Sequence, residues 1–111
     1  MRLIIAGGRS YRLTSDDYVR IEGLLSEVSE VVSGGATGAD SDGEAWAREH
    51  DLPVRQFLPK WRKFGRTAGL IRSREMAEYA DGVALFTGGR VTDNMFAEAI
   101  RSGIRVYDLI S

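Results

Sequence analysis

The sequence predicts an α/β protein with a five-stranded parallel sheet, and three observations support that fold class. Strand-like and helix-like segments alternate along the whole chain, with short turns between them. Three strand-like segments end in a glycine pair that a helix-like stretch follows: Gly7-Gly8, Gly34-Gly35 and Gly88-Gly89. The 111 residues, 43% of them hydrophobic, are enough for one domain over 1–111 with its own core.

In the first half of the chain, strands are expected at 2–7, 30–33 and 54–57, with a helix in each gap. The first helix begins near Thr14 or Ser15, either of which can cap it, and its apolar residues keep helical spacing as far as Val28. The second helix follows Gly38, with Ser41 and Glu44 spaced as a capping box. It ends by residue 51, because a proline at 53 opens the third strand.

In the second half, a loop rich in charged and aromatic residues is expected over 58–66, ahead of a third helix. One face of that helix is expected to hold Leu70, Ser73, Ala77 and Ala80. A fourth strand over 82–87 leads to a helix capped by Thr92 and ended by Gly103, and a fifth strand follows over 105–109. Right-handed crossovers with one reversal predict the order 3-2-1-4-5, with helices on both faces.

The glycine pairs predict a ligand-binding edge. A parallel sheet brings the carboxyl ends of its strands together, and bare backbone beside helix N-termini suits phosphate or another anion. Any single pair could instead serve a tight turn. The expected ligand-binding residues are Gly7, Gly8, Arg9, Gly34, Gly35, Ala36, Gly38, Asp40, Arg72, Gly88, Gly89, Arg90 and Thr92.

These residues are given different roles. The backbone amides of Gly8, Gly35 and Gly89 are expected to hold phosphates, and the arginines at 9, 72 and 90 to supply charge. Asp40 accepts hydrogen bonds from a sugar or amine, or else caps the second helix. Trp61 and Phe64 form a lid that stacks on a base, anchor the loop to the core, or fill a subunit interface of a homodimer.

The chain offers little for catalysis and no metal site. It has no cysteine and one histidine, His50, without an obvious partner. Asp40, Asp93 and Glu98 are the candidate acids or bases near the edge, although each could equally serve its helix. Neither a Walker phosphate loop nor the dinucleotide fingerprint is present.

Charge and hydropathy exclude further classes of function. A net charge of −1 argues against general affinity for nucleic acid, although a basic stretch runs from 60 to 74. No apolar run approaches the length of a membrane span, and the apolar start over 1–6 is too short for a signal peptide. We therefore expect a cytoplasmic protein, in a bacterium or in the host cytoplasm if a phage encodes it.

These motifs together resemble the SLOG superfamily of Rossmann-like nucleotide-binding domains, in particular its YspA/YpsA-like branch of small bacterial and phage proteins. The resemblance rests on Gly7-Gly8-Arg9, on 34–40, on 57–72 and on Gly88-Gly89-Arg90-Val91-Thr92. It implies a ligand such as ADP-ribose, NAD or a nucleoside monophosphate. Relatives include LOG phosphoribohydrolases, which cut the N-glycosidic bond of nucleotides, and the DNA-processing DprA proteins.

The chain departs from the LOG motif Pro-Gly-Gly-x-Gly-Thr-x-x-Glu. Thr87 stands at the proline, Val91 at the third glycine and Met95 at the catalytic glutamate. A methionine cannot donate a proton, so the resemblance disfavours that hydrolase mechanism. The sequence thus predicts a sensor or sequestering module for a nucleotide-derived ligand. The alternatives are an N-glycosidic hydrolase that uses another carboxylate and, more weakly, a module that binds single-stranded nucleic acid.

Overall fold

The computed structural model describes residues 1–110 and confirms the α/β class and the strand order. Parallel pairing joins the strands in the order β3-β2-β1-β4-β5. The strands are β1 (Arg2–Ala6), β2 (Glu30–Ser33), β3 (Val54–Gln56), β4 (Gly82–Leu85) and β5 (Arg105–Asp108). Most of them end one or two residues earlier than the sequence predicted, which leaves those residues to the loops at the carboxyl edge.

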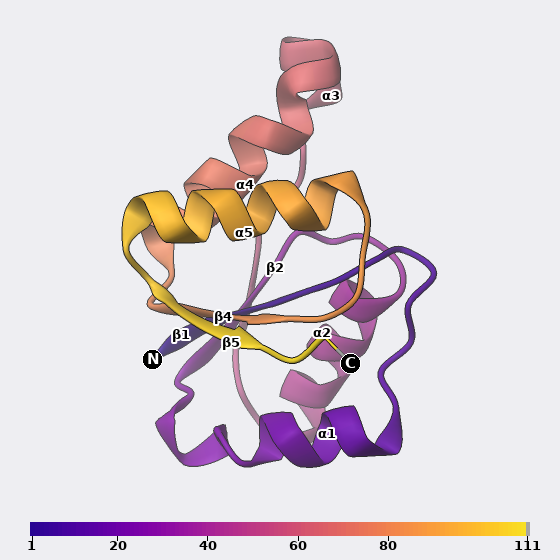
Figure 1. Ribbon diagram of the computed structural model, residues 1–111, viewed down its shortest axis with the longest axis vertical. Coiled ribbons are helices and arrows are strands. Elements are labelled where there is room, and N and C mark those ends of the chain that lie inside the picture. Colours follow the sequence, from indigo (N-terminus) through magenta and orange to yellow (C-terminus); the bar gives the residue numbers. More distant parts are fainter. Residues whose placement is uncertain (111) are drawn as a thin grey trace.

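Helices cover both faces of the sheet, as predicted. Helices α1 (Ser15–Glu22) and α2 (Ala39–Glu49) lie on one face, and α4 (Ala68–Tyr79) and α5 (Arg90–Ser102) on the other (Figure 1). The short helix α3 (Trp61–Phe64) and a 3-10 turn over Gly65–Thr67 lead into α4. None of the helices in residues 1–110 has the length and apolar character of a membrane span.

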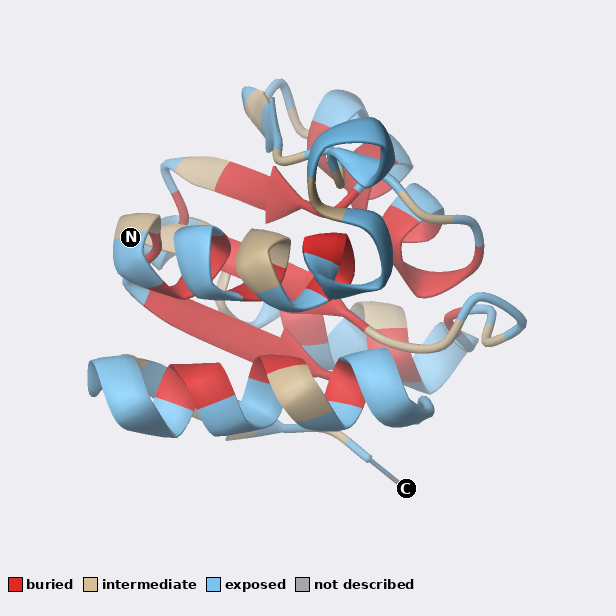
Figure 2. Cartoon of the chain, turned by 90° about the horizontal axis from the view of Figure 1, so that it is seen from above, coloured by how far each residue is buried: buried red, intermediate tan, exposed pale blue. Residues whose placement is uncertain are grey.

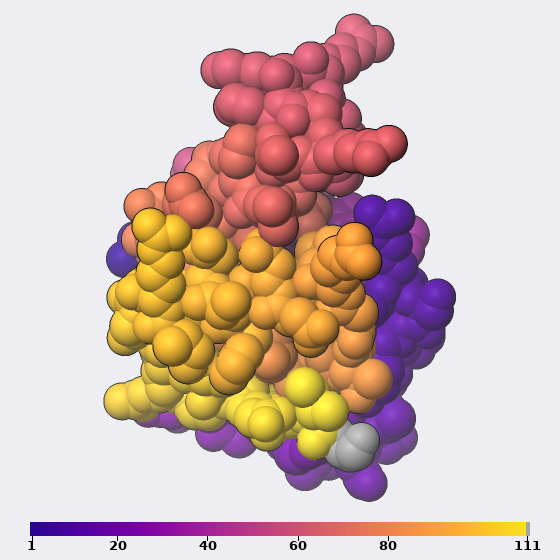
Figure 3. Space-filling view, turned by 45° about the horizontal axis from the view of Figure 1, so that its top comes forward, coloured from indigo at the N-terminus to yellow at the C-terminus, as the bar shows by residue number. Residues whose placement is uncertain are grey.

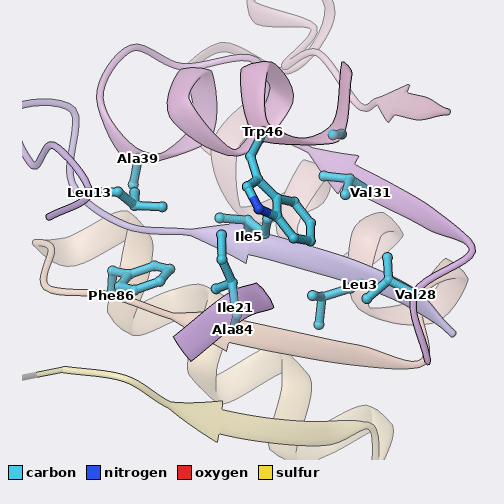
Figure 4. Packing of buried hydrophobic residues seen from close by; sticks show 11 residues of the cluster. Leu3, Ile5, Leu13, Ile21, Val28, Val31, Ala39, Trp46, Ala84 and Phe86 are labelled. Atoms are coloured by element: carbon cyan, nitrogen blue, oxygen red, sulfur yellow. The ribbon is translucent and has the colours of Figure 1, made fainter. Parts of the chain in front are cut away.

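The core has two halves because successive strand residues point to opposite faces of the sheet. Leu3 and Ile5 of β1 face α1 and α2, where they meet Ile21 and Trp46 (Figure 4). Ile4 and Ala6 face the other way, toward α4 and α5, and belong to a second buried cluster. Figure 2 shows the resulting pattern: the central strands are buried, and the outward faces of the helices are exposed. Because the sheet is packed on both faces, it holds the loops at its carboxyl edge in position.

The ends of the helices differ from the predictions. Helix α1 begins after Thr14, which forms a capping box with Asp17, but it stops at Glu22 rather than near Val28. The amide of Gly23 closes this helix by donating to the carbonyls of residues 19 and 21. The apolar spacing in the sequence runs past the end of α1 because a 3-10 turn over Leu25–Glu27 also brings apolar side chains to the core.

Two predicted N-caps are wrong. Helix α2 begins at Ala39 after Gly38, so the predicted capping box of Ser41 and Glu44 does not form. Instead, the carboxylate of Glu44 accepts a 2.6 Å hydrogen bond from the hydroxyl of Ser33 at the end of β2. Helix α5 begins at Arg90 after Gly89, so Thr92 lies inside its first turn rather than capping it.

The end of the last helix matches the prediction, and the segment before α4 matches it only in part. Gly103 closes α5 in the left-handed conformation with φ of 72°. The segment 58–66, predicted to be a loop, contains α3, which projects from the body of the molecule (Figure 1). On α4, Ser73, Ala77 and Ala80 are buried as the predicted face requires, whereas Leu70 is exposed.

Candidate functional site

A cavity of about 250 Å³ opens at the carboxyl edge of the sheet, beside the ends of β1 and β2. The loops that follow these strands form part of its wall, and α4 and the first turn of α5 complete it. Its lining residues are Ala6, Gly7, Gly8, Arg9, Gly34, Ala36, Asp40, Arg72, Ser73, Met76, Gly89, Arg90, Val91, Thr92 and Met95. The strand order reverses between β1 and β4, and a cleft is expected at such a switch point.

Most of the predicted binding residues lie in this wall, with three exceptions. Gly35 lines a neighbouring cavity instead. Gly38 and Gly88 are absent from both linings, and both are needed for packing. A Cβ at Gly38 would lie 2.4 Å from the carbonyl oxygens of Gly8 and Arg9, and one at Gly88 would lie 2.1 Å from Oγ1 of Thr92.

The backbone amides are placed differently from the expectation. The amide of Gly8 donates to the carbonyl of Thr87 at 2.9 Å, and that of Gly35 donates to the Ser33 hydroxyl at 3.0 Å. Both amides are therefore engaged within the protein. By contrast, the first amides of a helix have no partner within it, and α5 begins in the cavity wall with Arg90 and Val91. Its N-terminus carries partial positive charge and is the better place for an anion.

Three arginines give the cavity its positive charge. Arg9 and Arg90 are exposed at the rim, whereas Arg72 on α4 is partly buried. Nη1 of Arg72 donates to the carbonyl of Gly34 at 3.1 Å, and its buried Nε has no hydrogen-bond partner within residues 1–110. Burial lowers the pKa of Arg72, while nearby Asp40 raises it and Arg9 lowers it. The guanidinium stays charged, because an arginine pKa lies far above neutral.

Asp40 is the one acidic residue of the described chain that lines the cavity. Its side chain is buried and accepts a 3.3 Å hydrogen bond from the amide of Ala36. Burial raises the pKa of Asp40, against the opposing effects of the Ala36 amide and the Arg72 charge. The other two candidate carboxylates do not line the cavity: Asp93 is exposed, and Glu98 pairs with Arg74 at 3.6 Å.

The wall also contains hydroxyl and apolar side chains, most of which were not predicted to contact a ligand. Ser73 and Thr92 are buried in the wall, and neither hydroxyl has a hydrogen-bond partner in the part of the chain described. Of these two, only Thr92 was among the predicted residues. Ala6, Met76 and Met95 add apolar surface to the wall. These side chains belong to the buried cluster of that face, so no local pattern distinguishes them from core residues.

A second cavity, of about 350 Å³, lies beside the first and includes one of the two predicted lid aromatics. It is lined by Arg9, Gly34, Gly35, Ala36, Thr37, Pro59, Trp61 and Arg72. Trp61 begins α3 and is half exposed in this wall. Phe64 is outside the lining, and the ammonium of Lys63 lies over its ring at 5.1 Å. Of the two aromatics that were predicted to form a lid, only Trp61 therefore lines a cavity.

The remaining titratable candidate lies elsewhere. His50 contacts Glu22 at 3.6 Å and packs against Trp46, on the face of the sheet that α1 and α2 cover. In residues 1–110 there is no group of three or more His, Cys, Asp or Glu side chains placed to hold a metal ion. The chemistry at the edge therefore comes from arginines, hydroxyls, one carboxylate and the α5 amides.

Comparison with known protein families gives a match over the first part of the chain. The model of the YspA, cpYpsA-related SLOG family, called YAcAr, matches residues 1–64. This range includes the first two glycine pairs and Asp40, and it ends before Arg72 and the third pair. No curated protein and no solved structure matches the chain.

Proposed function

The chain belongs to the YspA, cpYpsA-related SLOG family, and from that premise we propose that it binds a nucleotide-derived ligand. The family is Rossmann-like and related to nucleotide chemistry. We place the ligand at the carboxyl edge of the sheet, in the cavity beside β1 and β2. Met95 stands where the LOG phosphoribohydrolases carry their catalytic glutamate. Because a methionine cannot act as an acid or base, we assign the protein a binding role, as a sensor or a sequestering module.

The observation that carries this proposal is the combination of charge and shape in one cavity. Arg9, Arg72 and Arg90 line it, together with the N-terminal turn of α5. Arginine and free helix amides both favour phosphate, and the apolar part of the wall suits the less polar faces of a sugar or base. The one carboxylate, Asp40, already lies near Arg72 and leaves the site with excess positive charge.

Thermal unfolding with a panel of ligands tests the proposal. The panel contains AMP, ADP, ATP, NAD, ADP-ribose, cyclic nucleotides and short single-stranded DNA. A ligand at 100 times its Kd stabilises the folded protein by about 2.7 kcal/mol, so the midpoint should rise by roughly 10 °C. If no nucleotide derivative raises the midpoint, the proposal is wrong; a rise with DNA alone that salt abolishes would favour nucleic-acid binding.

A pair of arginine variants controls for general charge effects. Arg72→Met should lose the ligand-dependent rise, because it removes the partly buried one of the two arginines, Arg9 and Arg72, that line both cavities. Arg105→Met removes an equal charge from an exposed position on β5, outside both linings, and should keep the rise. Equal loss in both variants would indicate a diffuse attraction to the positive surface rather than a site.

A second function, N-glycosidic hydrolysis, is favoured by one observation. Asp40 is buried in the cavity wall and its pKa is raised, which suits a carboxyl group that donates a proton to a leaving base. Incubation with the tightest nucleotide should then release free base, and Asp40→Asn should abolish that release. Asp93→Asn and Glu98→Gln, whose side chains lie outside the cavity lining, are the matched controls.

A further inference from the structure

We propose that the ligand is a nucleoside diphosphate sugar, with its base against Trp61, its diphosphate at Arg72 and its terminal sugar beside Asp40. This inference rests on the proposed function and narrows its ligand to one chemical class. It joins the two cavities into a single site with three parts. Each part is assigned from the chemistry of the residues that line it.

The two cavities share a wall. Arg9, Gly34, Ala36 and Arg72 line both of them, so a ligand in one cavity approaches the same four residues as a ligand in the other. A molecule longer than a mononucleotide can therefore extend from one to the other across this shared wall. Their volumes, about 250 and 350 Å³, together fall in the range of small-molecule sites.

The shared wall is cationic, which assigns the central part of the ligand. Arg72 is fixed through its bond to Gly34, and Arg9 lies close enough to lower its pKa. The buried Nε of Arg72 lacks a partner in the described structure, and native proteins rarely leave such donors unused. Two adjacent guanidinium groups repel one another, and a diphosphate between them would relieve that repulsion and supply acceptors.

The first cavity suits a sugar better than a further phosphate. Asp40 presents a carboxylate, which repels phosphate but accepts hydrogen bonds from sugar hydroxyls. The buried hydroxyls of Ser73 and Thr92 line the same space, and either can donate or accept. Apolar surface from Met76 and Met95 completes the wall and suits the carbon face of a sugar ring.

The second cavity suits a planar base. Trp61 keeps about half of its surface exposed there, with Pro59 beside it. Its ring reaches back over α4, because a Cβ at Gly69 would lie 3.9 Å from the ring's Cη2 atom. The segment that contains α3 projects from one end of the body (Figure 3), and Trp61, which begins α3, lines the second cavity. An indole in this position provides a stacking surface for a base.

Calorimetric titration of four ligands against three variants tests the assignment. The ligands are ribose 5-phosphate, AMP, ADP and ADP-ribose, and the variants are Trp61→Ala, Trp61→Phe and Asp40→Asn. Stacking of one base corresponds to a change in Kd of roughly 5- to 150-fold. Trp61→Ala should weaken AMP, ADP and ADP-ribose by this factor, Trp61→Phe should restore most of the affinity, and ribose 5-phosphate should bind all three Trp61 forms equally.

The terminal sugar is tested by the difference between ADP-ribose and ADP. The parent protein should bind ADP-ribose at least tenfold more tightly than ADP, and Asp40→Asn should remove that advantage. Two results would overturn this inference while the proposed function stands. One is equal affinity of the parent for ADP-ribose and ADP, and the other is equal affinity of the parent and Trp61→Ala for AMP. If the parent binds none of the four ligands, this inference fails; the proposed function fails only if the other nucleotide derivatives of the thermal panel also leave the midpoint unchanged.

Discussion

Gly89→Val is the variant that tests the cavity most directly. Gly89 lies in the cavity wall at the N-cap of α5, with φ of −105°, which is outside the left-handed region that favours glycine. A Cβ built on it meets no atom within 4 Å. The fold therefore does not require glycine for packing at this position, and a valine side chain would occupy space beside the α5 amides.

The expected changes in stability and in binding differ in size. Valine is a poorer N-cap than glycine, so the free energy of unfolding should fall by about 1 kcal/mol or less. Loss of one hydrogen bond to a charged ligand group costs about 1.5–3 kcal/mol, which raises Kd roughly 10- to 150-fold. Urea denaturation measures the first change, and calorimetric titration with the tightest ligand of the panel measures the second.

The neighbouring glycine is the matched control. A Cβ at Gly88 would lie 2.1 Å from Oγ1 of Thr92 and 2.8 Å from the amide nitrogen of Gly8. Gly88→Ala should therefore destabilise the fold by about 1–3 kcal/mol through overpacking. If Gly89→Val binds ligand as tightly as the parent, the cavity is not the binding site. If Gly88→Ala is as stable as the parent, our account of the loop packing is wrong.

The remaining predictions concern the scaffold. Asp42→Asn should lower stability in urea by about 1–3 kcal/mol at pH 7, because Asp42 accepts hydrogen bonds from Arg12 and from the amide of Leu13. The bond from Arg12 holds the pKa of Asp42 below its usual value. The contribution of Asp42 to stability is therefore complete above about pH 4 and is lost as the pH falls through the lowered pKa. A free energy of unfolding that still differs between parent and variant in strong acid would contradict this account. Trp46→Phe should cost less than about 1.5 kcal/mol, against about 3–5 kcal/mol for Trp46→Ala, since the buried indole N–H has no partner in residues 1–110. Thr14→Ala should cost about 1 kcal/mol in thermal unfolding by removing the cap of α1, and an unchanged midpoint would argue against the capping box.

The sheet could be predicted from the sequence because its determinants are local or topological. Buried strands appear as short apolar runs, and the handedness of crossovers leaves few possible orders. Helix ends could not be predicted equally well, because distant residues compete for the same side chains. Ser41 and Glu44 have the spacing of a capping box, yet Glu44 bonds instead to Ser33 and Gln56, which lie on neighbouring strands.

The candidate site could be predicted in part for the same reason. The glycine-rich loops and Arg72 follow from strand ends and helix spacing, and the structure brings most of them to one cavity. The use of each amide depends on contacts that no local pattern contains. The amide of Gly8, for example, donates to Thr87, which lies 79 residues later in the sequence.

The recurrence of glycine pairs therefore has two physical origins. Gly7 and Gly88 let chains approach closely: a Cβ at Gly7 would lie 2.7 Å from that of Ala39, so the loop after β1 can pack against the start of α2. In this close packing the amide of Gly8 donates to the Thr87 carbonyl and is not free to bind a phosphate. Gly89 and the first turn of α5 remain in the cavity wall. Close-packed glycines such as Gly7 and Gly88 thus shape the site, whereas substitution of Gly89, which has free space beside it, should change ligand binding more than stability.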